Sequence, residues 1–173
     1  MNRLSVEKYK EASKIPLVIV LNNIRSVYNV GSIFRTADAF RVNKLYLCGI
    51  TAQPPIAEIH KTALGAEDSV DWEYFENTLD CVKQLKAEGF IVISVEQVEQ
   101  SLKLQNWTPS LNFKYALVVG NEVKGVQQDV VDAGDGCLEI PQFGTKHSLN
   151  VSCAASIVMW EYFSQFLNGL GEF

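Results

Sequence analysis

The sequence predicts an α/β domain with a mainly parallel sheet flanked by helices, and three observations support this prediction. Short β-branched runs alternate with helical stretches along the chain. The first run, Leu17 to Leu21, is apolar without a break, which is typical of a strand buried on both faces. Proline or glycine marks several boundaries, as at Pro16 and Gly49. Ligands of such sheets bind beyond the carboxyl ends of the strands.

The bulk composition suits one globular domain over residues 1–173, of which 47% are hydrophobic and 20% charged. A net charge of −5 argues against a protein that coats nucleic acid by charge alone. Four cysteines stand far apart without metal-ligand spacing, so we expect reduced thiols, no metal site and a cytoplasmic protein. The apolar runs are strand-sized and too short to span a membrane, and we expect no targeting segment.

The first elements follow from local pattern. Residues 1–15 are predicted to form a short polar extension with room for one helical turn or two. After the strand 17–21, residues 29–40 are predicted to be helical, with their apolar positions on one face. Residues 45–48 read as the next strand, and residues 59–64 as a short helix.

The middle of the chain repeats the alternation. Residues 77–88 have apolar positions at helical spacing and a stop at Gly89. Residues 90–95 and 115–119 are predicted strands. Residues 97–112 between them are polar and without clear period, which predicts a loop.

The C-terminal part ends in a long helix. Residues 127–131 are predicted to form a short helix and residues 137–140 a strand, before a loop and a helix over 149–168. That helix is apolar on two faces, so one face can meet its own sheet and the other a partner subunit. The alternative is a helix buried deep in a monomer.

Three polar clusters follow strand ends. In the first, Asn29 stands at the expected cap of the helix, with Gly31 and Arg35 on its polar face. Arginine side chains lean toward the helix start, so Arg35 can reach an anion held there by the helix dipole. A capped helix with a solvated arginine is the equally open alternative.

The second cluster runs from Gly120 to Gly125 after the strand 115–119. Glycine at a strand end lets the backbone approach a ligand closely. The cluster is not a phosphate loop, because Val126 stands where a lysine is required. The alternative is a tight turn with Asn121 in the left-handed conformation.

The third cluster joins Ile140-Pro141 to Ser148-Leu149-Asn150-Val151. Ser148 is expected to help cap the final helix. A hydrolase using His147 and Ser148 is disfavoured, because adjacent residues rarely form a nucleophile–base pair and no GxSxG elbow occurs.

In this order the clusters resemble the three motifs of the SpoU/TrmH family, in the SPOUT superfamily of methyltransferases. Asn29-x-Gly31-x-x-x-Arg35-x-Ala37 is similar to motif one, Gly120-Asn121-Glu122-x-x-Gly125 to motif two, and Ile140-Pro141 with Ser148-Leu149-Asn150-Val151 to motif three. The resemblance runs from about Leu17 to Phe166. Arg41 and Val123 depart from it, since the family often has glycine at both positions.

The resemblance implies a C-terminal trefoil knot over residues 115–168, the SPOUT α/β-knot, and a homodimer through the C-terminal helix. It implies S-adenosyl-L-methionine as cofactor, held largely by backbone at Val95, Glu96, Gly120, Ile140, Ser148 and Leu149. Folding rules alone make knots improbable and would predict an unknotted doubly wound sheet.

The implied reaction is methyl transfer to a ribose 2′-hydroxyl of RNA, with tRNA somewhat favoured over rRNA. The residues implied in catalysis are Arg35, Asn29, Glu122, Ser148 and Asn150. Arg35 would act as base or, since guanidinium normally stays protonated, as a phosphate clamp. Guesses for RNA contacts are Arg25, Arg41, Lys61, Lys124 and Lys146.

Two other functions stay open at this point. One is a non-catalytic knotted module that binds RNA or cofactor. The other is a doubly wound small-molecule enzyme with a phosphate-bearing substrate, which would suit the acidic pI of about 5.1.

Overall fold

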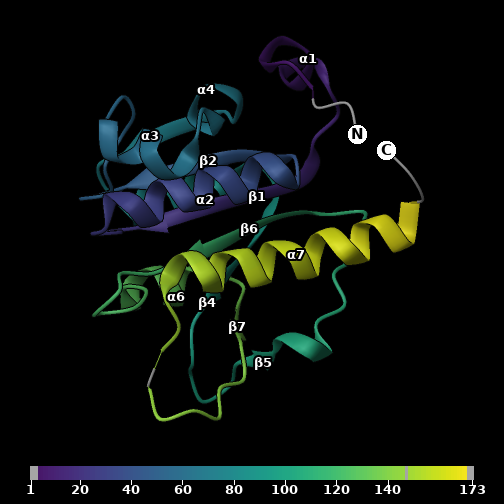
Figure 1. Cartoon of the computed structure of the whole chain (residues 1–173). Coiled ribbons are helices and arrows are strands. Elements are labelled where there is room, and N and C mark those ends of the chain that lie inside the picture. The colour runs from purple at the N-terminus through teal and green to yellow at the C-terminus, as the bar shows by residue number, and fades with distance from the viewer. Residues whose placement is uncertain (1–3, 147, 171–173) are drawn as a thin grey trace.

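The computed structural model describes residues 4–146 and 148–170, and its centre is a parallel sheet of seven strands (Figure 1). The strand order is β3-β2-β1-β6-β4-β7-β5, and the pairings between neighbours are parallel. The strands are β1 Ile15–Asn22, β2 Val42–Cys48, β3 Trp72–Phe75, β4 Phe90–Val95, β5 Leu102–Lys103, β6 Lys114–Val119 and β7 Gly136–Glu139. The predicted fold class is confirmed, although the edge strands β3 and β5 were not predicted.

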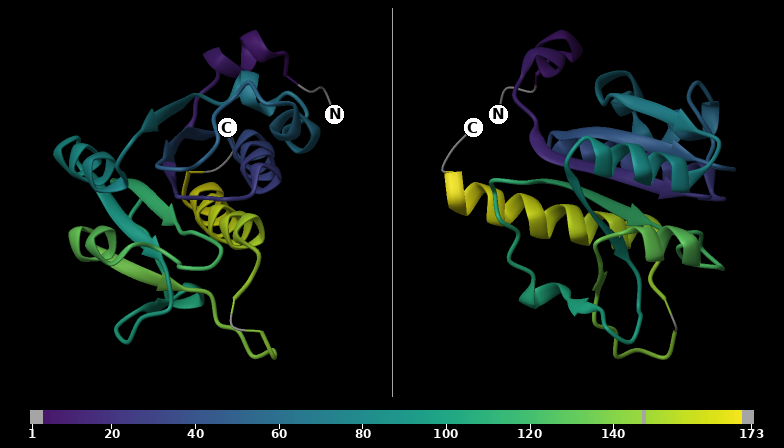
Figure 2. Two further views of the ribbon diagram at one scale, coloured as in Figure 1. Left: turned by 90° about the vertical axis from the view of Figure 1, so that its left-hand side faces the viewer. Right: turned by 180° about the vertical axis from the view of Figure 1, so that it is seen from behind.

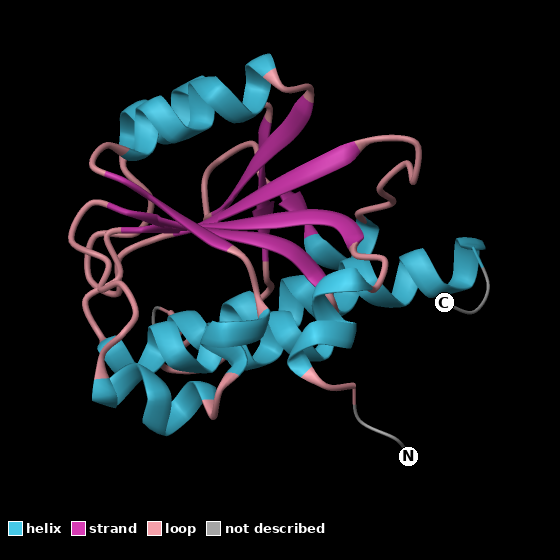
Figure 3. Cartoon of the chain, turned by 90° about the horizontal axis from the view of Figure 1, so that it is seen from above, coloured by secondary structure: helices cyan, strands magenta, loops and turns pink. Residues whose placement is uncertain are grey.

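Helices cover both faces of the sheet (Figures 2 and 3). They are α1 Val6–Glu11, α2 Val27–Ala39, α3 Ala57–Ala63, α4 Ala66–Ser69, α5 Thr78–Ala87, α6 Gln128–Ala133 and α7 Val151–Leu170, with a 3-10 turn at Leu104–Asn106. Alternate residues of β1 serve the two faces: Leu17 and Ile19 join the core beneath α2 and α7, and Val18 joins the core beneath α5 and α6. Burial on both faces explains the unbroken apolar run.

Helix α2 starts two residues earlier than predicted, and it packs closely against α3. Its N-cap is Ser26, whose hydroxyl accepts from the Asn29 N–H at 3.3 Å, so the prediction of Asn29 as cap was wrong. Gly31 is buried rather than on a polar face. A Cβ there would lie 2.1 Å from Thr62 Oγ1 and 2.4 Å from the Ile59 carbonyl oxygen, so the glycine allows close packing of α2 on α3.

Helix α7 is capped by Asn150. The Asn150 Oδ1 accepts from the Ser152 N–H at 2.9 Å and from the Cys153 N–H at 3.4 Å. The cap predicted at Ser148 therefore lies two residues further on. One apolar face of α7, with Ala155, Val158 and Tyr162, is fully buried.

The other apolar face of α7 lies open in the single chain. Cys153 is exposed, Ile157 is 39% exposed and Trp160 is 54% exposed. The two faces predicted from the sequence are therefore present, and only one of them is covered by the protein's own fold.

The segment 97–112 is largely irregular, as predicted, but it is anchored at both ends. Its N-terminal part pairs as β5 with β7. Its C-terminal part buries Trp107 against Tyr115 and Tyr162, and Gln165 of α7 donates to the Trp107 carbonyl at 2.7 Å. This segment thus ties the sheet edge to the final helix.

Candidate active site

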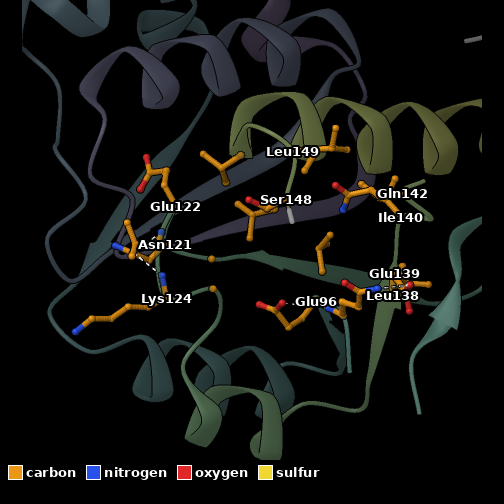
Figure 4. A pocket seen from close by; sticks show the side chains of 18 residues that line it. Glu96, Asn121, Glu122, Lys124, Leu138, Glu139, Ile140, Gln142, Ser148 and Leu149 are labelled. Atoms are coloured by element: carbon orange, nitrogen blue, oxygen red, sulfur yellow. Dashed lines mark hydrogen bonds between the residues drawn. The ribbon is translucent and has the colours of Figure 1, made fainter. Parts of the chain in front are cut away.

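A pocket of about 340 Å³ opens at the carboxyl ends of β4, β6 and β7 (Figure 4). Its volume lies within the usual range of small-molecule sites. The residues predicted from the resemblance to hold a cofactor all line it: Val95, Glu96, Gly120, Ile140, Ser148 and Leu149. The structure therefore brings the second and third sequence clusters together at the edge of the sheet where ligands were expected.

The motif-two loop is built by glycine and one asparagine. A Cβ at Gly120 would lie 2.3 Å from the Gly125 carbonyl carbon and the Val126 nitrogen, so only glycine fits there. Asn121 Oδ1 accepts from the N–H groups of Val123 at 2.9 Å and Lys124 at 3.0 Å. The left-handed residue is Gly125, at φ +69°, and not Asn121 as the turn interpretation supposed.

Glu122 joins the three clusters. Its carboxylate accepts from the backbone N–H of Arg25 at 2.9 Å and of Ser26 at 3.0 Å, and from Asn29 Nδ2 at 3.1 Å. Asn150 Nδ2 in turn donates to Asn29 Oδ1 at 3.2 Å. Three of the residues predicted for catalysis are thus one hydrogen-bonded chain at the pocket.

The hydrogen bonds of this network keep Glu122 charged. Burial raises the pKa of the Glu122 carboxyl, but the hydrogen bonds from Arg25, Ser26 and Asn29 outweigh it, so the net pKa lies below its ordinary value. The carboxylate also occupies the start of α2, where the sequence suggested that a substrate anion could sit. The anion at that helix start is the protein's own.

Arg35 stands apart from the pocket. It is exposed on α2 and is not among the lining residues. Its neighbour Thr36 contacts Ser156 of α7 through their hydroxyl oxygens at 3.0 Å, so this part of α2 packs on the final helix. Within one chain, the structure does not bring Arg35 into the pocket with Glu122.

The five basic residues suggested for RNA contacts lie in different parts of the structure. Lys124 lines the pocket, although its ammonium end points away from it in Figure 4. Arg25 donates its backbone N–H to Glu122, and Lys146 is exposed on the motif-three loop. Lys61 lies on α3. Arg41 lies at the amino edge, where its carbonyl accepts from the Ile15 N–H at 2.9 Å, so it is remote from the carboxyl-edge pocket.

Sequence reasoning assigned no role to the polar side chains of Gln97, Glu139 and Gln142, which line the pocket. Glu139 carried a usable signal, because it is a single charge within the apolar strand that leads into motif three. Gln97 carried none, since it begins the polar segment without periodicity. His147 falls outside the described residues.

The pocket suits a cationic ligand with polar groups. Glu96, Glu122 and Glu139 line it, and Glu96 Oε2 also accepts from the Val126 N–H at 2.9 Å. Strand-end backbone and the close approach permitted at Gly120 provide room and hydrogen-bonding groups for a small molecule. Over residues 4–146 and 148–170, no cluster of three or more potential metal ligands is present.

The fold and the pocket define an α/β protein with a small-molecule site at the carboxyl edge of a parallel sheet. The family model described as the SpoU rRNA Methylase family matches residues 16–160, and the chain belongs to that family. No helix in the described part of the chain is long and apolar enough to cross a membrane.

Several known proteins are similar to this chain. Relatives from Staphylococcus aureus, named as TrmH family tRNA/rRNA methyltransferases, are 30% identical over 158 residues, and the match covers 91% of this chain but only 62% of theirs. A tRNA (guanosine(18)-2′-O)-methyltransferase from Aquifex aeolicus is 30% identical over 84% of this chain and 67% of its own.

Solved structures agree with the fold. A TrmH/SpoU tRNA modifying enzyme from Aquifex aeolicus superposes with a TM-score of 0.83 at 25% identity, covering 95% of this chain and 83% of that one. An AdoMet-bound rRNA methyltransferase from Sinorhizobium meliloti gives a TM-score of 0.81 at 24% identity over 95% of this chain and 61% of that one, which shows the shared fold alone.

Proposed function

We propose that this protein transfers a methyl group from S-adenosyl-L-methionine to a ribose 2′-hydroxyl of RNA. The observation that carries the proposal is the pocket at the ends of β4, β6 and β7, lined by the second and third motifs and tied to motif one through Glu122. Family membership supports it, as do relatives whose names specify tRNA and rRNA methylation.

The proposed cofactor agrees with the charge of the pocket. S-adenosylmethionine carries a sulfonium and an ammonium, and the carboxylates of Glu96 and Glu122 at the pocket favour such cations. The rRNA methyltransferase from Sinorhizobium meliloti, a distant relative of the same fold, is AdoMet-bound. When bound, the cofactor supplies an electrophilic methyl group.

The chain's own residues would position the acceptor. The hydrogen bonds that join Glu122, Asn29 and Asn150 hold two side-chain amides next to the pocket residue Glu122, and we assign these amides to orient a ribose. Alignment of reacting groups can contribute about 7–11 kcal/mol to acceleration. Arg35 is assigned to the substrate phosphate, because a guanidinium presents several N–H donors in a fork that suits phosphate oxygens. Ser148, which also lines the pocket, is the remaining residue assigned to catalysis.

We propose a homodimer formed through the open face of α7, with Ile157 and Trp160 covered by a second copy. An exposed apolar patch of large side chains on a helix is typical of an interface. Phe40, the C-cap of α2, contacts Trp160 with ring centroids 5.7 Å apart, so this interface would include the C-terminal end of α2. We also propose a single domain over residues 1–173 and the trefoil knot within residues 115–168.

The proposed substrate is RNA, with tRNA favoured because one relative is named for a tRNA guanosine. Arg25, Lys124 and Lys146 are assigned to RNA phosphates, because each belongs to or contacts a loop that contributes to the pocket. The proposed compartment is the cytoplasm, where these RNAs occur.

Calorimetry with S-adenosylhomocysteine followed by single-turnover methylation of total RNA tests the proposal. We expect binding and transfer by the wild-type protein, and loss of transfer with normal cofactor affinity in Arg35→Ala. Lys83→Ala, an exposed cation on the opposite helix layer, is the matched control. Unchanged turnover of Arg35→Ala would refute its role.

The exclusion of Arg35 from the single-chain pocket favours one second candidate, a non-catalytic module that binds cofactor or RNA. Binding of S-adenosylhomocysteine without methylation of any RNA would support that candidate instead.

A further inference from the structure

The carboxylate of Glu139 holds one wall of the pocket in place. Glu139 ends β7, directly before Ile140, and its side chain is only 7% exposed. Its Oε1 accepts from Gln97 Nε2 at 3.0 Å. Its Oε2 accepts from Ser101 Oγ at 2.6 Å and pairs with Lys103 Nζ at 2.5 Å. Both oxygens are therefore engaged by one segment, residues 97–103.

That segment has little other support. Its only strand, β5, is two residues long and forms the edge of the sheet, where Leu102 and Lys103 pair with Leu138 and Glu139. Strands so short contribute few ladder hydrogen bonds. Two further hydrogen bonds are local: the Ser101 N–H donates to the Val98 carbonyl at 3.0 Å, and the Gln97 N–H donates to Glu96 Oε1 at 3.1 Å. The Glu139 carboxylate is consequently the point at which this polar segment is fastened to the sheet.

The fastened segment is part of the pocket. Gln97 lines it, together with Glu139 and Ile140. Because Gln97 donates its amide N–H to Glu139, its amide oxygen is left as the group available to a ligand. Hydrogen bonds from Lys103 and Ser101 lower the pKa of Glu139 below its ordinary value, so the carboxylate stays charged near neutral pH.

We propose that Glu139 is a positioning residue for the cofactor, which pre-forms the cofactor pocket by locking Gln97 and the segment 97–103 against β7. A preformed wall reduces the ordering cost that a ligand meets on binding. Glu139 acts through Gln97, so its loss should raise the KM for the cofactor by a larger factor than it lowers kcat. The proposal rests on the proposed function for the identity of the cofactor.

Exchanging the amide and the carboxylate between positions 97 and 139 tests the hydrogen bond between them. Gln97→Glu places two carboxylates together, and we expect the affinity for S-adenosylhomocysteine, measured by calorimetry, to fall about tenfold or more. Glu139→Gln weakens it less, because the amide oxygen can still accept from Ser101 and Lys103. The double variant, with Gln97→Glu and Glu139→Gln together, restores an amide donor opposite a carboxylate acceptor. Its affinity should therefore recover toward the wild-type value.

Two further readouts complete the test. Amide hydrogen exchange of residues 97–103 should speed up in Glu139→Ala without any ligand, and the KM for S-adenosylmethionine should rise by a larger factor than kcat falls. Glu73→Gln is the matched control, because Glu73 pairs with Lys44 at 2.6 Å near the opposite edge of the sheet. It should change neither property.

The outcomes separate the two proposals. If the wild-type protein binds no S-adenosylhomocysteine, the proposed function fails, while faster exchange in Glu139→Ala still supports the lock. If binding occurs but the double variant is no better than the worse single variant, or exchange of residues 97–103 is unchanged in Glu139→Ala, the positioning role is overturned.

Discussion

Replacing Glu122 by alanine removes the acceptor that links motif two to the start of α2. Three hydrogen bonds end on this carboxylate, from the Arg25 and Ser26 N–H groups and from Asn29 Nδ2, at 2.9, 3.0 and 3.1 Å. A hydrogen bond to a charged group contributes about 1.5–3 kcal/mol, and the three share a half-buried acceptor, so they are not additive. We expect Glu122→Ala to lower the free energy of unfolding by about 2–4 kcal/mol.

Glu122→Gln keeps an acceptor and loses the charge at the helix start, so a smaller loss of about 1 kcal/mol is expected. Urea denaturation followed by circular dichroism measures both variants. Glu76→Ala, an exposed carboxylate with no hydrogen bond or ion pair among the described residues, is the control. A loss below about 0.5 kcal/mol in Glu122→Ala, the range of ordinary surface substitutions, would refute this structural role.

The pH dependence follows from the same contacts. The pKa of Glu122 is lower in the folded protein than its ordinary value, so its contribution is fully present above the unfolded pKa of about 4.3 and is lost as the pH falls through the folded pKa. The stability difference between the wild type and Glu122→Ala should be constant from about pH 5 to 8 and shrink in stronger acid. A difference that grows in acid would contradict the sign.

Three other predictions concern packing and assembly. Gly31→Ala should lower the free energy of unfolding by about 1–3 kcal/mol in urea denaturation, because its Cβ would lie 2.1 Å from Thr62 Oγ1. Unchanged stability would show that α2 and α3 can move apart at little energetic cost. Gly125→Ala should weaken S-adenosylhomocysteine binding about tenfold in calorimetry, because the φ of Gly125 is +69° and the added Cβ would lie 2.3 Å from Glu96 Oε2. An affinity equal to that of the wild type would contradict a rigid motif-two loop. Trp160→Glu should convert the proposed dimer to a monomer in light scattering, and a persistent dimer would place the interface elsewhere.

The sequence pattern predicted the elements in which buried apolar residues recur at a regular spacing. The strand β1 and the helices α5 and α7 have apolar residues at the spacing their packing requires, so their existence was clear from the sequence. The edge strand β5 gave no such signal, because a side chain, Glu139, holds it rather than an apolar face. The edge strand β3 was missed as well, since it is only four residues long and only half buried.

The wrong prediction of Asn29 as a cap has a physical cause. Asn29 was a candidate for a local cap, but its side-chain amide donates to Glu122, a residue 93 positions away. Contacts over such separations are decided by the tertiary fold and not by neighbours in sequence. The residues predicted to hold the cofactor line one pocket because their motifs follow strands that lie side by side. Arg35 is not among the residues that line this pocket in the single chain.

The most direct measurement is methyl transfer from methyl-labelled S-adenosylmethionine to RNA, followed by alkaline hydrolysis. A 2′-O-methyl group blocks cleavage of the adjacent phosphodiester, so label on the ribose survives in dinucleotides. The wild-type protein should place the label in alkali-resistant dinucleotides, and Arg35→Ala should not. Label recovered only in mononucleotides, or no label in any RNA, would contradict ribose methylation by this protein.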